Sequence, residues 1–217
     1  MGFTLAAPVL EGTLVRLEPL GHQHADDLAA VAEADRSSFA YTWVPTAAEV
    51  GDYIDTQLGQ AVTGYLAPYA QIDRATGRAV GATSYFNPRL WPGQEGRLLA
   101  VEVGFTWLGA SAQGTGINPE AKLLLFTHAF EAWQAARVDL KTDARNERSR
   151  AAIAATGAHF EGVLRNWSRS WAPGEEGRLR NSALFSITAE EWPACKELLH
   201  VRVNRSLESP ERRRSKA

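Results

Sequence analysis

Residues 101–121 read VEVGFTWLGASAQGTGINPEA and carry the strongest structural signal in the chain. The apolar run at 98–108 predicts a strand, which leads into a glycine-rich turn and then into a helix with Asn118 as its expected N-cap. The first N–H groups of a helix have no partners within it, and Gly114 and Gly116 allow positive φ and a close approach of the backbone to a ligand. The segment therefore predicts a binding site for an anion such as phosphate or pyrophosphate.

The sequence of this turn does not match the motifs of two common phosphate-binding turns. A P-loop places a lysine directly after its second glycine, whereas Thr115 follows Gly114. A dinucleotide-binding fingerprint needs a third glycine or alanine three residues after the second, and here Pro119 stands at that place after Gly116. The P-loop is thus excluded and the dinucleotide fingerprint is disfavoured.

The composition is that of an ordinary globular protein. The 217 residues carry 23 Lys and Arg against 25 Asp and Glu, a formal net charge of -2, which argues against general nucleic-acid binding. The single cysteine, Cys195, excludes a disulfide scaffold and a cysteine-rich metal site, so no metal is expected. No apolar run approaches the roughly 18 residues of a membrane span, so we expect no membrane segment and a cytoplasmic protein.

The rest of the chain predicts one mixed α/β domain over residues 10–200, followed by a polar, disordered tail at 201–217. Alternating or short apolar runs predict strands at 13–20, 69–73, 79–86, 98–108, 138–142, 159–164 and 181–187. Helical spacing predicts helices at 24–34, 47–61, 118 onward, 147–156 and 189–199. Prolines and glycines predict a loop over 88–96. No repeat or linker interrupts this order.

The glycine-rich turn and several further blocks resemble the GNAT acetyltransferase superfamily, and within it the RimJ/RimL-like protein N-acetyltransferase branch. The family's acyl-CoA loop reads Q/R-x-x-G-x-G/A, and SAQGTG at 111–116 occupies its place. Ser111 departs from the usual Gln or Arg, and Gln113 stands where many members carry a basic residue, so one charge contact to the pyrophosphate is missing or replaced. Other matching blocks are EGTLVRL at 11–17, DARNERS at 143–149, IAATG at 153–157 and EGVLR at 161–165.

The resemblance implies a single GNAT-fold domain: a central mixed, mostly antiparallel sheet flanked by helices and splayed at the acyl-CoA site. It implies acetyl-CoA as co-substrate and no metal. The residues that the resemblance assigns to acetyl-CoA come from the strand, the turn and a later helix: Thr106, Trp107, Leu108, Gln113, Gly114, Thr115, Gly116, Ile117, Asn118, Asn146 and Ser149. The first three are expected to hydrogen-bond the pantetheine arm, and residues 113–118 are expected to hold the pyrophosphate.

The resemblance further implies that an amine attacks the acetyl thioester directly. Glu102, on the strand before the turn, is the expected base, with a bound water as an alternative proton relay. The stretch 151–160 holds no tyrosine for the acid role, so Ser149 is expected to hydrogen-bond the departing sulfur. Asn146 is expected either to orient the pantetheine arm or an ordered water, or merely to cap the helix that starts at Glu147.

The tryptophans in or beside predicted loops are candidate acceptor contacts. Aromatic side chains at such places either pack the loops or line a binding pocket, and this applies to Trp43, Trp91, Trp167 and Trp171. By resemblance, the acceptor is the N-terminal α-amino group of a protein or peptide. Two alternatives stay open: a small-molecule amine such as an antibiotic or metabolite, and a non-catalytic acyl-CoA-binding module. Exposed edges of the closing strands make a homodimer plausible.

Overall fold

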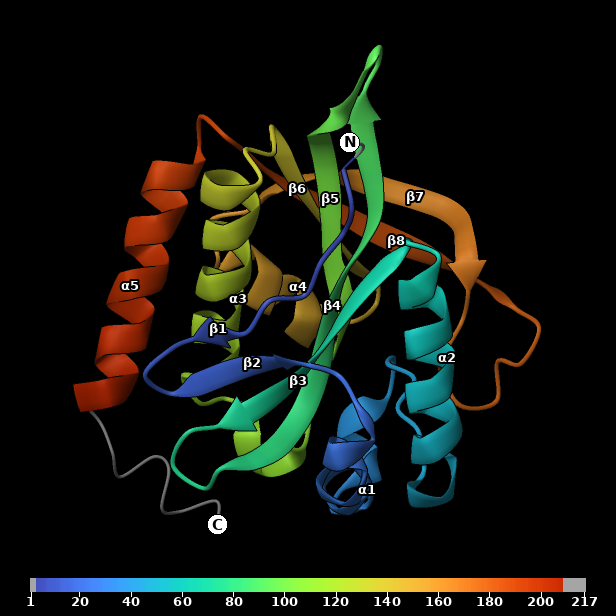
Figure 1. Ribbon diagram of the computed structural model, residues 1–217. Coiled ribbons are helices and arrows are strands. Elements are labelled where there is room, and N and C mark those ends of the chain that lie inside the picture. The colour runs from blue at the N-terminus through green and yellow to red at the C-terminus, as the bar shows by residue number, and fades with distance from the viewer. Residues whose placement is uncertain (1–2, 209–217) are drawn as a thin grey trace.

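A computed structural model describes residues 3–208, apart from the side chain of Glu95. Eight strands in this part of the chain form one sheet in the order β1-β2-β3-β4-β5-β6-β8-β7 (Figure 1). The strands are β1 (Leu10–Glu11), β2 (Val15–Pro19), β3 (Leu66–Asp73), β4 (Arg78–Trp91), β5 (Gln94–Leu108), β6 (Arg137–Asp143), β7 (His159–Arg169) and β8 (Leu179–Thr188). The α-helices are α1 (Ala25–Glu33), α2 (Val50–Val62), α3 (Ile117–Thr127), α4 (Glu147–Ala154) and α5 (Trp192–Glu208). The mixed α/β architecture is as predicted.

The sheet parts at its centre. Within residues 3–208, neighbouring strands pair antiparallel except β5 and β6, which are parallel. These two strands pair at only three positions, the last being Glu102 with Asp139, although β5 continues to Leu108 and β6 to Asp143. Beyond Glu102 the strands diverge, which confirms the predicted splay of a mostly antiparallel sheet.

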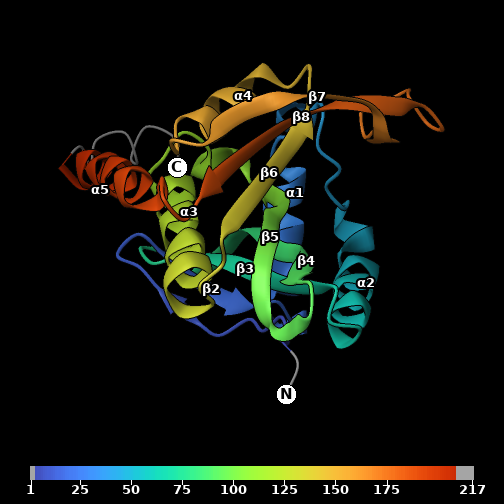
Figure 2. The same ribbon diagram turned by 90° about the horizontal axis from the view of Figure 1, so that it is seen from above.

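Helices cover both faces of the sheet and bury two apolar clusters. Figure 2 shows α3 and α5 on one side and α1 and α2 on the other. The first cluster joins residues of α3 such as Leu125 and Phe126 to Val101 of β5, and it also includes Ile153 of α4. The second cluster lies under α1 and α2 and includes the fully buried Leu28 and Ile54. Burial of these faces is the main stabilising contribution to the fold.

A buried carboxylate fixes the start of α3 against the β1–β2 segment. Glu120, in the first turn of α3, accepts hydrogen bonds from the backbone N–H groups of Thr13, Leu14 and Val15 at 2.8, 2.5 and 2.7 Å. A side chain at Gly12 would place its Cβ 2.5 Å from Glu120 Oε2. The glycine at position 12 thus leaves room for the carboxylate that satisfies three backbone donors.

The prediction of a loop over residues 88–96 is wrong for most of this stretch. Strands β4 and β5 continue through it and pair up to Trp91 and Gln94, with Gly93 at the tip at φ +72°. Pro88 is tolerated because the register of the two strands shifts between Phe86 and Arg89. A proline costs little where the ladder is already irregular.

The last helix is longer than the predicted 189–199. Helix α5 runs from Trp192 to Glu208, because Val203 lies one turn after Leu199 and both are buried in the first cluster. This corrects the predicted boundary at residue 200: residues 201–208 are helical. The remainder of the predicted polar tail, 209–217, lies outside the described residues.

Candidate functional site

Helix α3 begins two residues earlier than predicted. After β5 the chain makes a 3₁₀ turn at Ala110–Ala112, and α3 starts at Ile117 with Gly116 as N-cap, so Asn118 is the second helical residue and not the cap. Gly114 has φ +69°, as the sequence predicts, but Gly116 has φ -74°. Positive φ therefore accounts for the first glycine and not for the second.

Gly116 is required for packing inside the protein. A Cβ at this position would lie 2.4 Å from Leu14 Cδ1 and 2.6 Å from Ser206 Cβ. These atoms belong to the segment before β2 and to α5. The absence of a side chain thus lets the turn lie directly against both elements.

The turn offers unpaired polar groups to an anionic or polar ligand. The backbone N–H groups of Gly114 and Thr115 donate to no backbone carbonyl of residues 3–208. Asn118 Oδ1 is buried and has no hydrogen-bond partner among the described residues. Unsatisfied groups of this kind at the start of a helix fit the pyrophosphate and pantetheine groups of a coenzyme A thioester.

The end of β5 presents an unpaired edge to the splay. Phe105 has φ +48°, and the register with β4 shifts between Ala82 and Ser84, so β5 carries an extra residue there. Trp107 and Leu108 pair with β4 on one side but with no strand of the described chain on the β6 side. An extended arm bound at this edge would add a pseudo-strand, the role predicted for Thr106, Trp107 and Leu108.

A buried lysine under this edge was missed by sequence reasoning. Lys122 of α3 donates a hydrogen bond from Nζ to Thr106 Oγ1 at 2.8 Å, and Thr106 Oγ1 lies 2.8 Å from Thr83 Oγ1. Burial lowers the pKa of Lys122 from 10.5 to about 7. The available signal was a lysine within the otherwise apolar run 121–126.

Glu102 lies where β5 and β6 part. Its side chain is 3% exposed, and its Oε2 lies 2.8 Å from Lys141 Nζ of β6. Burial raises the pKa of the Glu102 carboxyl above its usual value, although the hydrogen bond and charge of Lys141 act in the opposite direction. A carboxylate with a raised pKa is suited to accept a proton near neutral pH.

Asn146 and Ser149 lie at the start of α4, which follows β6. Asn146 is the N-cap: its Oδ1 accepts a hydrogen bond from the Ser149 backbone N–H at 3.0 Å. Of the two roles expected for Asn146, the structure shows the capping one. Ser149 is half-buried, and its hydroxyl makes no hydrogen bond within residues 3–208. The hydroxyl is therefore available to a ligand.

The four candidate tryptophans do not form one group. The Trp43 and Trp171 rings lie 6.1 Å apart between centroids, and the Arg169 guanidinium lies 3.8 Å from the centre of the Trp171 ring. Trp167 lies beneath Lys141, whose ammonium is 4.8 Å from its ring centre. Trp91 is at the tip of the β4–β5 hairpin, which projects from the molecule at the opposite end of β5 from the glycine-rich turn (Figure 1). Trp91 is thus placed apart from the other three.

Arg145 ties the β7–β8 connection to the end of β6. Its guanidinium contacts Asp143 at 2.8 Å and Glu175 at 2.7 Å, and it lies 5.1 Å from the centre of the Tyr41 ring. Hydrogen bonds from Arg145 lower the pKa of Glu175 to about 2. This network holds loop 170–178, which carries Trp171, next to the segment that carries Trp43.

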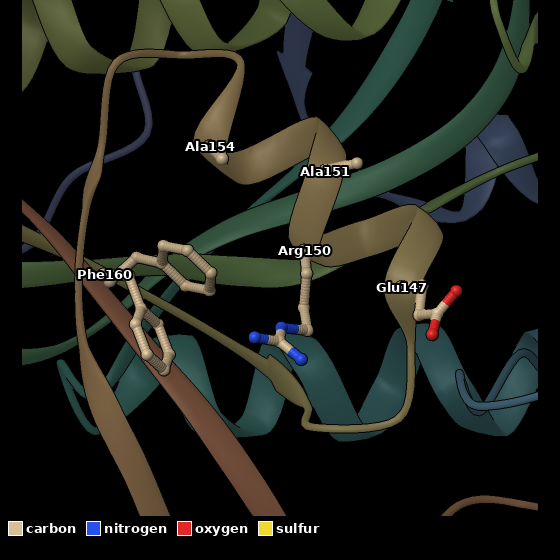
Figure 3. A pocket seen from close by; sticks show the side chains of 6 residues that line it. Glu147, Arg150, Ala151, Ala154 and Phe160 are labelled. Carbon is tan, nitrogen blue, oxygen red and sulfur yellow. The ribbon is translucent and has the colours of Figure 1, made fainter.

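A cavity of about 390 Å³ lies apart from the splay. It is a largely apolar hollow between α4, β7 and β8, lined by Glu147, Arg150, Ala151, Ala154, Phe160 and Phe185 (Figure 3). None of the predicted site residues lines it.

Within residues 3–208, no three His, Cys, Asp or Glu side chains gather as metal ligands, and no helix has the length and apolar character of a membrane span.

Comparisons with known proteins agree with this geometry. A family model described as an acetyltransferase (GNAT) domain matches residues 15–159. The structure is similar to a GCN5-related N-acetyltransferase from Brucella melitensis, with a TM-score of 0.78 and 27% identity over 90% of this chain and 85% of that one. No curated protein matches the chain.

Two more distant structures share the fold. RimL, described as a ribosomal L7/L12 alpha-N-protein acetyltransferase in complex with coenzyme A, has a TM-score of 0.66 and 16% identity over 83% of this chain and 98% of its own. The microcin C7 self-immunity acetyltransferase MccE, in complex with acetyl-CoA and AMP, has a TM-score of 0.66 and 18% identity over 82% and 93%.

Proposed function

The chain belongs to the GNAT acetyltransferase family, and from this premise we propose that it acetylates the α-amino group at the N-terminus of a protein or peptide. The enzyme is an acetyl-CoA-dependent N-acetyltransferase. The observation that carries the proposal is the position of Glu102, a buried carboxylate beside Lys141 at the point where β5 and β6 part. A proton acceptor at that place is what direct attack by an amine requires.

Acetyl-CoA would be held along the β5 side of the splay, by the glycine-rich turn and by the free edge of the strand. The N–H groups of the turn at 113–118 would bind its pyrophosphate, and the free edge of Thr106, Trp107 and Leu108 would bind its pantetheine arm. When bound, acetyl-CoA supplies the activated acetyl group. The turn itself carries no charged side chain between residues 110 and 116.

Glu102 would take the proton from the acceptor ammonium, directly or through one water. Burial raises its pKa, which makes it a stronger base than an exposed glutamate, while the hydrogen bond and charge of Lys141 favour the ionised form. Ser149, whose hydroxyl is available, would donate a hydrogen bond to the departing sulfur. Asn146 contributes by capping α4 and so fixing the position of Ser149.

The acceptor would lie against Trp43 and Trp171. RimL, which shares the fold, is described as acting on the N-terminus of a ribosomal protein. A RimJ/RimL-like activity on protein N-termini is thus the first candidate. The second candidate is a small-molecule amine, supported by the likeness to MccE and by the partly exposed Trp43, at 42%, beside Trp171. Flat aromatic surfaces of this kind also accept planar ligands.

A cytoplasmic location and a homodimer are two further parts of the proposal. The one cysteine, Cys195, is a buried free thiol, as is usual in a reducing cytoplasm. Strand β7 is an edge of the sheet, so a homodimer remains a prediction that sedimentation velocity can test.

The test is thiol release from acetyl-CoA with a panel of acceptors. N-terminal peptides with free and blocked α-amino groups form one arm, and small aromatic and aliphatic amines form the other. Turnover of free but not blocked peptides supports the proposal. Turnover of small amines alone would show that the acceptor is a small-molecule amine, the second candidate. Tight binding of CoA without turnover of any amine identifies a non-catalytic acyl-CoA-binding module.

A further inference from the structure

The glycine-rich turn has no cation of its own. Residues 110–116 read ASAQGTG. By the resemblance described above, Gln113 stands where many members of the family carry a basic residue. The next lysine along the chain, Lys122, is buried and donates to Thr106. A pyrophosphate carries two negative charges, so binding by backbone N–H groups alone would leave them without a positive side chain from this turn.

An arginine from another element reaches Gln113. Arg148, the second residue of α4, donates from Nη1 to Gln113 Oε1 at 2.8 Å and from Nη2 to the carbonyl of Ser38 at 2.5 Å. Gln113 in turn donates from Nε2 to the carbonyl of Leu108 at 2.7 Å. The guanidinium is thereby held over the turn at the end of β5.

The charge of Arg148 is not neutralised by the protein. Its hydrogen-bond acceptors, an amide and a carbonyl, are both uncharged, and it forms no ion pair with any carboxylate that the structure describes. The residue also lies in the first turn of α4, where the helix dipole disfavours a positive charge. An exposed cation kept at such a position is explained if an anion binds beside it.

We propose that Arg148 supplies the cation of the pyrophosphate site, in place of the basic residue that the turn lacks at position 113. Gln113 positions the guanidinium, and the N-terminal end of α3 provides the N–H groups. The inference rests on the proposed use of acetyl-CoA and adds a residue from α4 to its binding site. Arginine suits the role because its planar guanidinium can donate two hydrogen bonds to one phosphate.

A purely structural role for Arg148 makes different predictions. The contacts with Ser38 and Gln113 also join α4 to the Arg36–Phe39 segment and to the turn. If this link were the whole role, removing it would change stability and would weaken every ligand of the site equally. A phosphate contact instead affects only ligands that carry the pyrophosphate.

The experiment is isothermal titration of the full chain with three ligands: CoA, 3′-dephospho-CoA and S-acetylpantetheine, which lacks both the pyrophosphate and the 3′-phosphate. We expect Arg148→Gln to weaken CoA and 3′-dephospho-CoA about tenfold to a hundredfold, as for loss of a charge-assisted hydrogen bond. S-acetylpantetheine should bind within about twofold of the wild-type value. The salt dependence of CoA binding should become shallower in the variant.

A matched control and a rescue complete the design. Arg150→Gln removes an arginine from the same helix that instead lies 5.4 Å from the centre of the Phe160 ring, and it should leave all three affinities unchanged. Adding Gln113→Arg to Arg148→Gln returns a cation to the turn and should restore most of the CoA affinity. The thermal midpoint of each variant without ligand reports whether it is folded.

The inference would be overturned by a CoA affinity of Arg148→Gln within twofold of wild type, by an equal loss for S-acetylpantetheine, or by no recovery in the double variant. Loss for CoA with retained affinity for 3′-dephospho-CoA would also overturn it, because the contact would then be to the 3′-phosphate. If the wild-type protein binds no CoA, the proposed function itself fails, a result separate from any variant.

Discussion

The Glu102 carboxylate and the Lys141 ammonium lie 2.8 Å apart across the opening between β5 and β6. Glu102 is the last residue of β5 that pairs with β6, opposite Asp139, and Lys141 is two residues further along β6 on the same face. The ion pair therefore stands at the closed end of the splay. A buried base and its counter-charge are held there by strands that are themselves fixed in register.

Glu102→Gln tests this carboxylate as the base. We expect kcat to fall by about 10²–10⁴, the usual contribution of a general base. Burial raises the pKa of Glu102, so the wild-type rate should rise with pH as this carboxyl deprotonates, and the variant should lack that rise. Steady-state rates between pH 5 and 9 measure both. Glu131→Gln, at an exposed carboxylate that contacts Lys196, is the control. An unaltered pH–rate profile in Glu102→Gln would leave the water relay as the proton acceptor.

The two glycines of the turn should respond differently to alanine. At Gly114 the φ of +69° disfavours any side chain by about 1–2 kcal/mol, and a change of the turn should weaken CoA binding. At Gly116 a Cβ meets Leu14 and Ser206, so Gly116→Ala should lower the free energy of unfolding by about 1–3 kcal/mol. Thermal unfolding and CoA titration of both variants distinguish the cases. A stable Gly116→Ala protein with lost CoA affinity would show that this glycine faces the ligand after all.

Lys122 predicts a pH dependence of stability. The pKa is about 7 in the folded protein and near 10.5 in the unfolded chain, so between these values the unfolded state binds more protons. Stability should therefore rise with pH across this window, by up to about 1.4 kcal/mol per pH unit, and be lowest below pH 7, where the charged lysine is buried. Lys122→Met should remove the rise. Urea unfolding at pH 6.5, 8 and 9.5 measures it. Parallel curves for wild type and variant would contradict a depressed pKa.

Glu120 should be among the residues most important for stability. Its carboxylate accepts from three backbone N–H groups at 13–15, and Glu120→Gln would turn an amide NH₂ toward at least one of them. Each buried donor left without an acceptor costs about 1–3 kcal/mol, so we expect a loss of roughly 2–4 kcal/mol in the free energy of unfolding. Chemical denaturation gives the value. A loss below about 0.5 kcal/mol would mean that water replaces the carboxylate at these donors.

Local sequence patterns were enough for the strand–turn–helix and for the order of elements, because the apolar periodicity and Gly114 act within a few residues. The contacts that complete the site could not be predicted from local patterns, because they join residues that are far apart in the chain. Glu120 accepts hydrogen bonds from N–H groups more than 100 positions away in the sequence. Arg148 of α4 donates hydrogen bonds to Ser38 and Gln113, which belong to other parts of the fold. The loop predicted over 88–96 failed because the strand pairing tolerates Pro88 at an irregular register. Trp91 was accordingly grouped with tryptophans that it does not approach.

The acceptor assignment of Trp43 and Trp171 is tested with Trp43→Leu. Stacking on an aromatic ring contributes about 0.5–1.5 kcal/mol, so KM for the acceptor should rise about two- to tenfold. KM for acetyl-CoA should stay unchanged, because the ring contacts of Trp43 are with Tyr53 and Trp171. Trp91→Leu is the matched control: its ring lies at the hairpin tip against Arg97, so both KM values should remain at wild-type levels. If Trp91→Leu raised the acceptor KM and Trp43→Leu did not, the acceptor would approach along the β4–β5 hairpin, and Trp43 and Trp171 would only pack loop 170–178.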